Sequence, residues 1–346
     1  MNVVKGSDVG HQPVASSARR HPSLADVAVL AGVSHMTVSR VINDSGVVRP
    51  ATRERVLAAI ESIGYRPNTA ARALVTGRTG TLGVVTLDST LYGPASTLYG
   101  VERAARDAGF AITVASISQP GGQAIAEAVE SLQRQAVEGI VVIAPHVATA
   151  KALEFAPHGV PLVAVGGAAS PVPAVSVDQY DGARLATEHL LSLGHKTVWH
   201  VGGPADWLEA AERERGWRET LKAHGVRRPR LTRGDWSPRS GYQAGKALAG
   251  ESSLGAVFVA NDQMALGLLR AFTEAGISVP GDVQLVGFDD IPEAEFFNPP
   301  LTTVRQDFDE VGRRTFHLLS EQMNGGRPSS EQIPARLIVR ESSGAA

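Results

Sequence analysis

Polar side chains gather in one short segment of this sequence, between residues 34 and 40. They carry hydroxyl, imidazole, thioether and guanidinium groups and belong to Ser34, His35, Met36, Thr37, Ser39 and Arg40. On a helix, Val38, Val41 and Ile42 would face the opposite way and be buried. Hydroxyl and guanidinium groups bond to base edges and phosphates, and a methionine suits the methyl group of thymine. The segment therefore predicts a helix whose exposed side contacts DNA.

The preceding residues predict the element that holds this helix in place. An apolar face at helical spacing is formed by Leu24, Val27, Ala28 and Ala31. Gly32 permits a tight turn, and Ser34 can cap the next helix through its hydroxyl. Two short helices joined in this way have the layout of a helix-turn-helix, which inserts its second helix into the major groove of DNA.

A third helix is expected to pack across the first two. It begins at Pro50, because proline is favoured in the first turn of a helix, and it ends before Gly64. Its expected buried side consists of Val56, Leu57, Ile60 and Ile63. The following TAARALV segment is a helix too short to be stable alone, so we interpret it as a hinge that folds only when something holds it.

The charge distribution agrees with a polyanion bound at the front of the chain. Residues 1–80 carry 10 Lys and Arg against 5 Asp and Glu, whereas the remainder carries 23 against 30. This basic front and acidic remainder suit a protein whose first part alone meets nucleic acid. The chain has no cysteine, which excludes disulfides and thiolate metal sites. Residues 1–21 lack the apolar run of a secretory signal, and no stretch approaches a membrane span, so we expect a cytoplasmic protein with no membrane partner.

From Leu82 onward, apolar runs alternate with helical segments. The runs are LGVVTL, FAITVAS, GIVVIAP, PLVAVGG, TVWHVGG, GAVFVAND and VQLVGFDD. Alternation at this spacing predicts parallel strands with helices on both faces of the sheet. About 260 residues exceed one ordinary sheet, so we expect an α/β core of two doubly wound lobes with a cleft between them.

Catalytic motifs are missing from the sequence. GYQAGKA, around Lys246, lacks the spacing of a phosphate-binding loop, and neither GxGxxG nor GxSxG occurs. The histidines show no metal-binding pair, and the adjacent Asp289 and Asp290 are poorly placed for acid and base roles. We therefore expect no enzyme activity, no metal and no cofactor.

Several long segments resemble the lac repressor family, and within it the branch that gives the family its name. They are LADVAVLAGVSHMTVSRVIN, NTAARALVTGRT, GDWSPRSGY, VANDQMALG and PPLTTVRQDF, spread from about Leu24 to Arg340. The resemblance implies a helix-turn-helix headpiece, a hinge helix and a two-lobed core like that of periplasmic sugar-binding proteins. It also implies three crossings between the lobes, near Val177, near residues 305–308 and near Pro334.

The domain boundaries follow from these segments. We expect a disordered leader at 1–21, the DNA-binding headpiece at 22–67, a hinge helix and linker at 68–80, and the effector-binding and dimerisation core at 81–342. The first lobe is expected at about 81–177 and 308–334, and the second at about 178–305 and 335–342.

The resemblance assigns DNA contacts residue by residue. It implies a homodimer on a near-palindromic double-stranded operator, with His35 and Met36 choosing the base sequence and Arg40 one turn later. Leu74 matches a leucine that wedges into the minor groove, supported by Asn68 and Arg72. The full set is Leu24, Ser34, His35, Met36, Thr37, Ser39, Arg40, Asn43, Tyr65, Asn68, Arg72 and Leu74.

The resemblance also implies an effector site for a small sugar or glycoside between the lobes. Trp236 would stack on the sugar, Arg213, Asn261 and Asp289 would hydrogen-bond to it, and the remaining wall would come from Leu91, Pro94, Gln306 and Phe308. Each has a simpler structural interpretation: Trp236 as core, Asp289 as a helix cap, and Arg213 as a solvated side chain of a charged helix.

Three positions depart from the galactoside-binding pattern of that branch. Ile143 stands in place of an asparagine, Gly166 in place of an aspartate, and Glu209 in place of a serine. Lost hydrogen-bond partners change selectivity strongly, so a glycoside is expected without a commitment to galactosides.

Three alternatives stay open at this point. A purine-type branch of the family uses corepressors, so the ligand could recruit DNA instead of releasing it; release is the first expectation. A solute-binding protein shares the core but needs an export signal and no basic headpiece, and a sugar-modifying enzyme needs reactive groups that are missing here. Only ESSGAA follows Arg340, without a heptad-patterned tail, so a dimer is expected rather than a tetramer.

Overall fold

The computed structural model describes residues 22–42, 47–66, 73, 77–87, 90–118, 121–143, 145–154, 159–167 and 170–344. The chain divides into two compact units, Met1–Arg78 and Thr79–Ala346. The expected leader and four expected DNA contacts, Asn43, Asn68, Arg72 and Leu74, lie outside the described residues. No single helix of the described part has the length and apolarity to cross a membrane, and one bent pair, residues 24–31 with 35–42, meets that test by length and composition alone.

The first unit contains the three predicted helices: α1 (Leu24–Ala31), α2 (His35–Ile42) and α3 (Pro50–Ile63). Ser23 caps α1 in a reciprocal capping box with Asp26, and the backbone turns at Gly32 with φ of 62°. The Ser34 hydroxyl accepts from the Thr37 amide at 3.3 Å, as the sequence predicted. The chain bends by 105° between α1 and α2, within the range of a helix-turn-helix.

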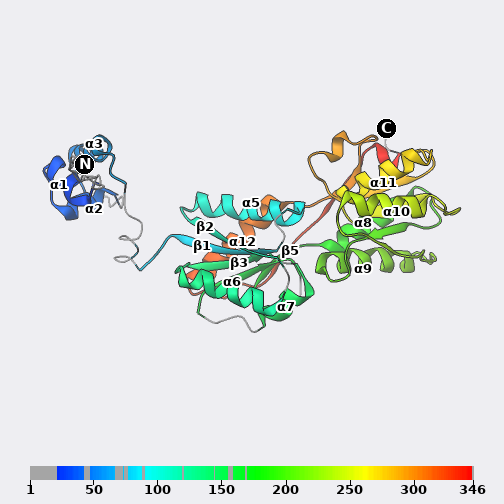
Figure 1. Cartoon of the computed structure of the whole chain (residues 1–346), viewed down its shortest axis with the longest axis horizontal. Helices are drawn as coiled ribbons and strands as arrows, with labels where there is room; N and C mark the ends of the chain where they lie inside the picture. The colour runs from blue at the N-terminus through cyan, green and yellow to red at the C-terminus, as the bar shows by residue number, and fades with distance from the viewer. Residues whose placement is uncertain are drawn as a thin grey trace, which may run out of the picture. The chain divides into compact units, whose positions relative to one another are not determined.

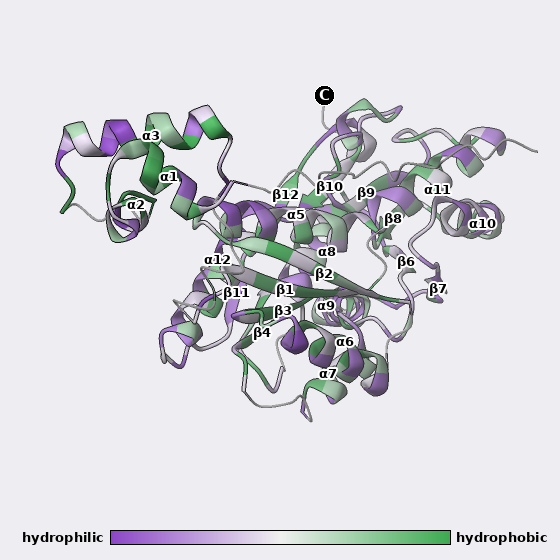
Figure 2. Ribbon diagram, turned by 60° about the vertical axis from the view of Figure 1, so that its left-hand side comes forward, coloured by the Kyte–Doolittle hydropathy of each residue, from purple (hydrophilic) through white to green (hydrophobic). Residues whose placement is uncertain are grey.

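The second unit holds two six-stranded sheets, one in each lobe (Figure 1). The first sheet has the order β11-β5-β4-β3-β1-β2, and all its strands are parallel. Its strands are β1 (Thr81–Leu87), β2 (Ala111–Ile117), β3 (Gly139–Ile143), β4 (Leu162–Val165), β5 (Ala174–Val177) and β11 (Glu331–Ile333). Hydrophobic residues, green in Figure 2, run along these strands.

The second sheet has the order β12-β10-β9-β8-β6-β7, with β12 antiparallel to β10 and the other pairs parallel. Its strands are β6 (Trp199–Gly202), β7 (Thr232–Arg233), β8 (Ala256–Val259), β9 (Gln284–Asp289), β10 (Thr302–Arg305) and β12 (Arg336–Ile338). The seven predicted strands are all present. The five that were missed, β5, β7, β10, β11 and β12, have two to four residues each.

Helices cover both faces of each sheet, as predicted. In the first lobe, α5 (Tyr92–Asp107) and α12 (Phe308–Met323) share one face, and α6 (Gly122–Arg134) and α7 (Val147–Leu153) share the other. In the second lobe, α8 (Gln179–Ser192) pairs with α9 (Leu208–Ala223), and α10 (Pro238–Leu248) pairs with α11 (Asp262–Glu274). Two short 3-10 turns, Ala294–Phe296 and Glu341–Ser343, complete the second lobe.

Three connections carry the chain between the lobes. They are β5 to α8, β10 to α12, and β11 to β12. The second connection, from β10 to α12, leads into a close contact between α12 and α5 in the first lobe. A Cβ atom at Gly100 of α5 would lie 2.5 Å from the carbonyl oxygen of Phe308, and one at Gly312 of α12 would lie 2.2 Å from the carbonyl carbon of Gly100. The two helices touch through their backbones here, so neither glycine has room for a side chain.

We expect Gly312→Ala to lower the free energy of unfolding by about 1–3 kcal/mol, because the added methyl forces α12 away from α5. Urea denaturation measures the loss. Gly121→Ala is the matched control, because a Cβ at Gly121 meets nothing within 4 Å. Equal stability of the two variants would contradict the backbone contact.

Candidate DNA-binding surface and interlobe cleft

The start of α2 presents an exposed polar surface. Ser34, His35, Met36 and Arg40 are exposed, whereas Thr37 and Ser39 are half-buried. Met36 keeps 64% of its surface exposed and is therefore accessible to another molecule. On the opposite side of α2, Val38 and Val41 are buried in the headpiece core.

Two expected DNA contacts also have a packing role. Leu24 packs against the headpiece core and Tyr65 is buried within it. Their contact with DNA stays a prediction. The expectation for the third helix was wrong at Leu57, which is 49% exposed, because Ala59 occupies the buried position.

A cleft between the lobes collects seven of the eight expected effector residues. Leu91 and Pro94 come from the first lobe, and Gln306 from the connection between β10 and α12. Arg213, Trp236, Asn261 and Asp289 come from the second lobe. Five further residues complete the lining: Tyr92, Gly93, Trp207, Glu209 and Gln263. The space between these side chains is about 30 Å³, room for one water molecule, so a larger ligand requires the walls to separate.

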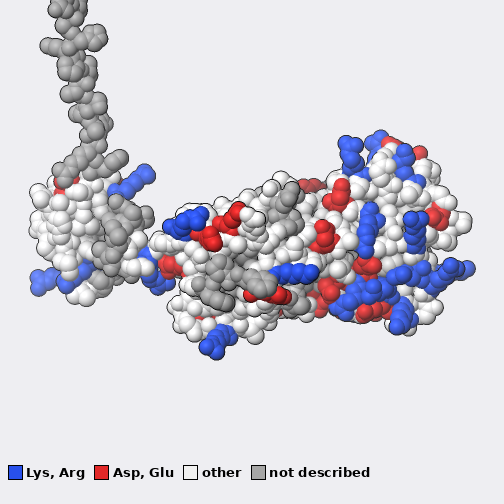
Figure 3. All heavy atoms as spheres, turned by 60° about the horizontal axis from the view of Figure 1, so that its bottom comes forward, with Lys and Arg blue, Asp and Glu red and all other residues white. Residues whose placement is uncertain are grey.

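Arg213 is unlike its helix neighbours, because it is only 2% exposed. On the face shown in Figure 3, Lys and Arg gather over the second lobe with acidic residues among them. The α9 residue Arg215 is half-exposed and pairs with Glu212 at 2.6 Å. The guanidinium of Arg213 instead points inward and lies 3.9 Å from the centre of the Phe288 ring. The interpretation of Arg213 as a solvated side chain is therefore wrong.

Three polar side chains form a closed ring with this guanidinium. Arg213 Nε donates to Gln179 Oε1 at 2.8 Å, and Gln179 Nε2 donates to Gln306 Oε1 at 2.8 Å. Gln306 Nε2 then donates to Asp289 Oδ1 at 2.7 Å, and that oxygen lies 3.5 Å from the Arg213 guanidinium. Arg213 also donates to the carbonyl of Ala260. The ring fixes the orientation of Arg213 and Asp289 on this wall of the cleft.

Burial raises the pKa of Asp289 to about 6, and the charge of Arg213 and the hydrogen bond from Gln306 oppose this rise. The residue is the last of β9 and has a positive φ of 112°. Asp262 holds the adjoining loop: its carboxylate accepts from Thr303 Oγ1 at 2.6 Å and from the Ile291 amide at 2.9 Å. The cap of α11 is Asn261, whose Oδ1 accepts from the Met264 amide at 2.9 Å, so the helix-cap interpretation applies to Asn261 and not to Asp289.

Two tryptophans line the second-lobe side of the cleft. Trp236 is 7% exposed, and its ring lies edge-on to Trp207 with centroids 5.6 Å apart. Its buried Nε1 has no hydrogen-bond partner among the described residues. Such an orphaned donor is costly unless something else accepts from it, so Trp236 belongs both to the core and to the cleft surface.

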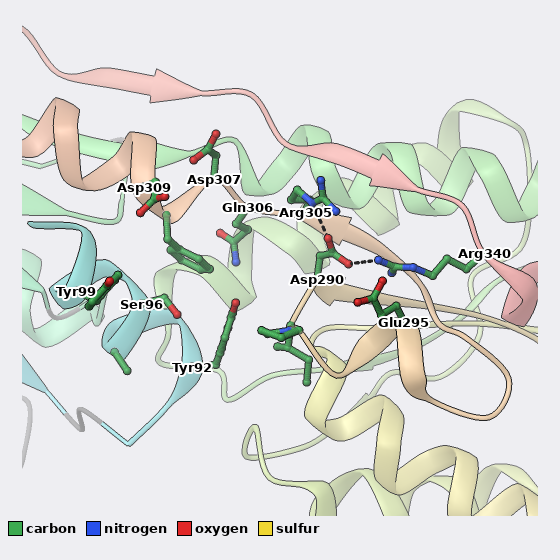
Figure 4. Close-up of a pocket in the computed structure, with 14 residues that line it drawn as sticks. Tyr92, Ser96, Tyr99, Asp290, Glu295, Arg305, Gln306, Asp307, Asp309 and Arg340 are labelled. Carbon is green, nitrogen blue, oxygen red and sulfur yellow. Dashed lines mark hydrogen bonds and ion pairs between the residues drawn. The ribbon is translucent and has the colours of Figure 1, made fainter. Parts of the chain in front are cut away.

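Phe308 does not line the cleft, contrary to the expectation. It lies in a neighbouring open groove of about 680 Å³ and contacts Tyr92 edge-on, with ring centroids 5.7 Å apart. Figure 4 shows Tyr92 and Gln306 in this groove, with Asp290 paired to Arg305 and Arg340. Phe308 is the first residue of α12. Its role here is to support Tyr92, which belongs to both spaces.

A direct contact joins the two lobes beside Trp207. The Val147 amide donates to the Asp206 carbonyl at 3.1 Å, and the Leu208 amide donates to the Pro145 carbonyl at 3.0 Å. His146 Nε2 lies 3.1 Å from Asp206 Oδ2, and the His146 ring packs edge-on against Trp207. We call residues 145–147 with 206–208 the interlobe clasp.

Sequence reasoning missed Gln179, Trp207 and His146. Gln179 follows β5, a strand that the sequence analysis did not predict. Trp207 stands in GPADWLE, outside the quoted segments, although an aromatic residue just before a charged helix was a usable signal. His146 has no local pattern at all. Among the described residues, no group of three or more His, Cys, Asp or Glu side chains could hold a metal ion.

Known proteins share these features. Residues 23–68 match the family model described as bacterial regulatory proteins, lacI family, and residues 187–343 match a periplasmic binding protein-like domain. The lactose operon repressor of Escherichia coli K12 is 34% identical over 92% of this chain and 90% of its own. The structure of the lac repressor dimer bound to operator and the anti-inducer ONPF has a TM-score of 0.87 at 34% identity, covering 94% of this chain and 100% of that one. The CelR–cellobiose complex has a TM-score of 0.69 at 35% identity, covering 93% and 99%.

The headpiece, the two-lobed core and these matches define a transcription regulator that binds DNA and is not an enzyme. The chain belongs to the lacI family of bacterial regulatory proteins.

The pKa of Asp289 makes the stability of the core depend on pH. The folded protein keeps this proton up to about pH 6, whereas the unfolded chain loses it near the usual aspartate pKa of 3.8. The resulting stabilisation is full below the unfolded pKa and is lost as the pH rises through 6. We expect the wild type to lose about 2 kcal/mol from this source between pH 4.5 and 6.5, and Asp289→Asn to lose none.

Urea unfolding followed by tryptophan fluorescence measures this difference, because all four tryptophans lie in the core unit. Parallel pH dependences of the two proteins would contradict the raised pKa of Asp289.

Proposed function

We propose that this protein is a homodimeric repressor that binds a near-palindromic operator and is released by a small sugar or glycoside in the interlobe cleft. The observation that supports the ligand site best is the ring of Arg213, Gln179, Gln306 and Asp289 beside two tryptophans. Fixed polar groups next to aromatic rings match the hydroxyls and the apolar face of a sugar. The cellobiose complex of a relative supports the same ligand class.

The DNA-binding end of the proposal uses the exposed side of α2. His35 and Met36 lie at its exposed start, where a recognition helix contacts base edges, and Arg40 is exposed one turn later. An arginine that donates two hydrogen bonds to guanine contributes ~1–3 kcal/mol of discrimination against the other bases. Two headpieces in a dimer then match two similar half-sites. Because the proposed operator is part of the bacterial chromosome, we propose that the protein acts in the cytoplasm.

In the hinge, we expect Leu74→Ala to weaken specific operator binding and leave ligand binding intact. Wedging an apolar side chain into a base step costs a few kcal/mol, which the bent DNA and its added protein contacts offset. Filter-binding titration with operator and with random DNA measures the specific part. Unchanged operator affinity would remove the proposed role of Leu74.

Ligand control of DNA binding follows from where the cleft lies. Its walls belong to different lobes, so a ligand that favours one arrangement of the lobes shifts the equilibrium by its differential affinity, typically ~1–3 kcal/mol. Release of the operator by the ligand is the direction that we propose. A ligand that increases operator retention in the same filter assay would instead support the corepressor mode.

We expect Asp289→Asn to give a repressor that binds operator but ignores the ligand. The amide keeps the size of the side chain, yet it removes the negative acceptor that faces Arg213 and the cleft. Calorimetry with cellobiose, lactose and ONPG as probes measures ligand binding, and Asp107→Asn, an exposed substitution on α5, is the control. Normal binding of a probe by Asp289→Asn would contradict the assignment.

A further inference from the structure

Glu209 is the charged residue of the cleft whose carboxylate lacks a hydrogen bond. It is the second residue of α9 and lines the cleft near Trp207 and Arg213. Among the described residues no donor bonds to this carboxylate, whereas Arg213 and Asp289 are both engaged in the polar ring. Its electrostatic partner is Arg213, whose charge lowers a pKa that burial raises. An acceptor of this kind gains most from a ligand that supplies donors.

The first lobe offers no side chain at the point that Glu209 faces. Gly166 follows β4 with a φ of +88°, and a Cβ there would lie 3.6 Å from Glu209 Oε1 and 2.8 Å from Pro145 Cβ. Strain and contact both exclude a larger residue at 166. The first-lobe wall is formed by Leu91, Tyr92, Gly93 and Pro94 and carries no charge. All charged groups of the cleft therefore come from the second lobe.

A ligand held beside Glu209 must bring donors for its carboxylate, and hydroxyl groups supply them. Anionic groups would be repelled by Glu209 and Asp289. An ammonium group would face the positive charge of Arg213, which already acts on Glu209.

We propose that Glu209 is a specificity-determining residue that accepts hydrogen bonds from two adjacent hydroxyl groups of a neutral saccharide. This inference rests on the function proposed above. It assigns selection of the hydroxyl pattern to the second lobe, while the first lobe supplies an apolar surface for the rest of the ligand.

A purely local role of Glu209 makes a different prediction. An acidic residue in the first turn of a helix interacts favourably with the helix dipole, whatever the cleft contains. Replacement would then lower stability slightly and leave ligand affinity and selectivity unchanged. The test must therefore measure selectivity as well as affinity.

The experiment uses the full chain and the variants Glu209→Gln and Glu212→Gln. Glu212 lies on the same helix and pairs with Arg215, so it is a matched acidic control. Calorimetry with cellobiose, lactose and methyl β-glucoside gives the affinities. Monodeoxy analogues of the tightest probe then remove one hydroxyl at a time, and glucosamine tests a cation.

We expect Glu209→Gln to lose about tenfold or more in saccharide affinity, with operator binding retained and Glu212→Gln unchanged. Two adjacent hydroxyls of the sugar are removed one at a time. Each removal should weaken binding to the wild type strongly and binding to Glu209→Gln much less. This difference would show that Glu209 interacts with both hydroxyls.

Three outcomes would overturn the inference. Equal affinities of wild type and Glu209→Gln, or a wild-type preference for glucosamine over the neutral sugars, would contradict it and leave the proposed sugar site intact. Failure of the wild type to bind any saccharide would overturn both proposals together.

Discussion

The cleft depends on one buried positive charge. Moving a guanidinium out of water costs several kcal/mol, so Arg213 can be 2% exposed only because its partners compensate it. Those partners come from separate elements: Gln179 begins α8, Ala260 follows β8, and Asp289 ends β9. The Arg213 side chain thereby fixes the start of α8, the end of β8 and the end of β9 relative to one another.

The same ring reaches two of the three connections between the lobes. Gln179 directly follows the first crossing and Gln306 lies in the second, and the two side chains bond to each other. A ligand that contacts Asp289 or Arg213 therefore acts on groups bonded directly to the connections. This is a short physical route from an occupied cleft to a changed arrangement of the lobes.

Much of this arrangement could be predicted from sequence, because periodic segments and long motifs carry strong local signals. The cleft residues after β8 and β9 follow parallel strands, whose carboxyl ends line ligand sites in this class of fold. The sequence-based predictions failed where the direction of a side chain depends on the exact rotation of its helix. Leu57 and Phe308 both lie on helices whose rotation the sequence left open, and a step of one residue turns a side chain by about 100°. Pairings between lobes, such as His146 with Asp206, have no sequence signal because they form only after both lobes fold.

The interlobe clasp and the cleft share Trp207, and this links closure to occupancy. On one side, Trp207 packs against His146 across the lobe boundary; on the other, it lines the cleft edge-on to Trp236. The cleft has room for about one water molecule while the clasp is formed, so a larger ligand must displace side chains around Trp207 or separate the lobes. In both cases the clasp contacts change with occupancy. Differential contacts of this kind are what a ligand requires in order to shift a two-state equilibrium.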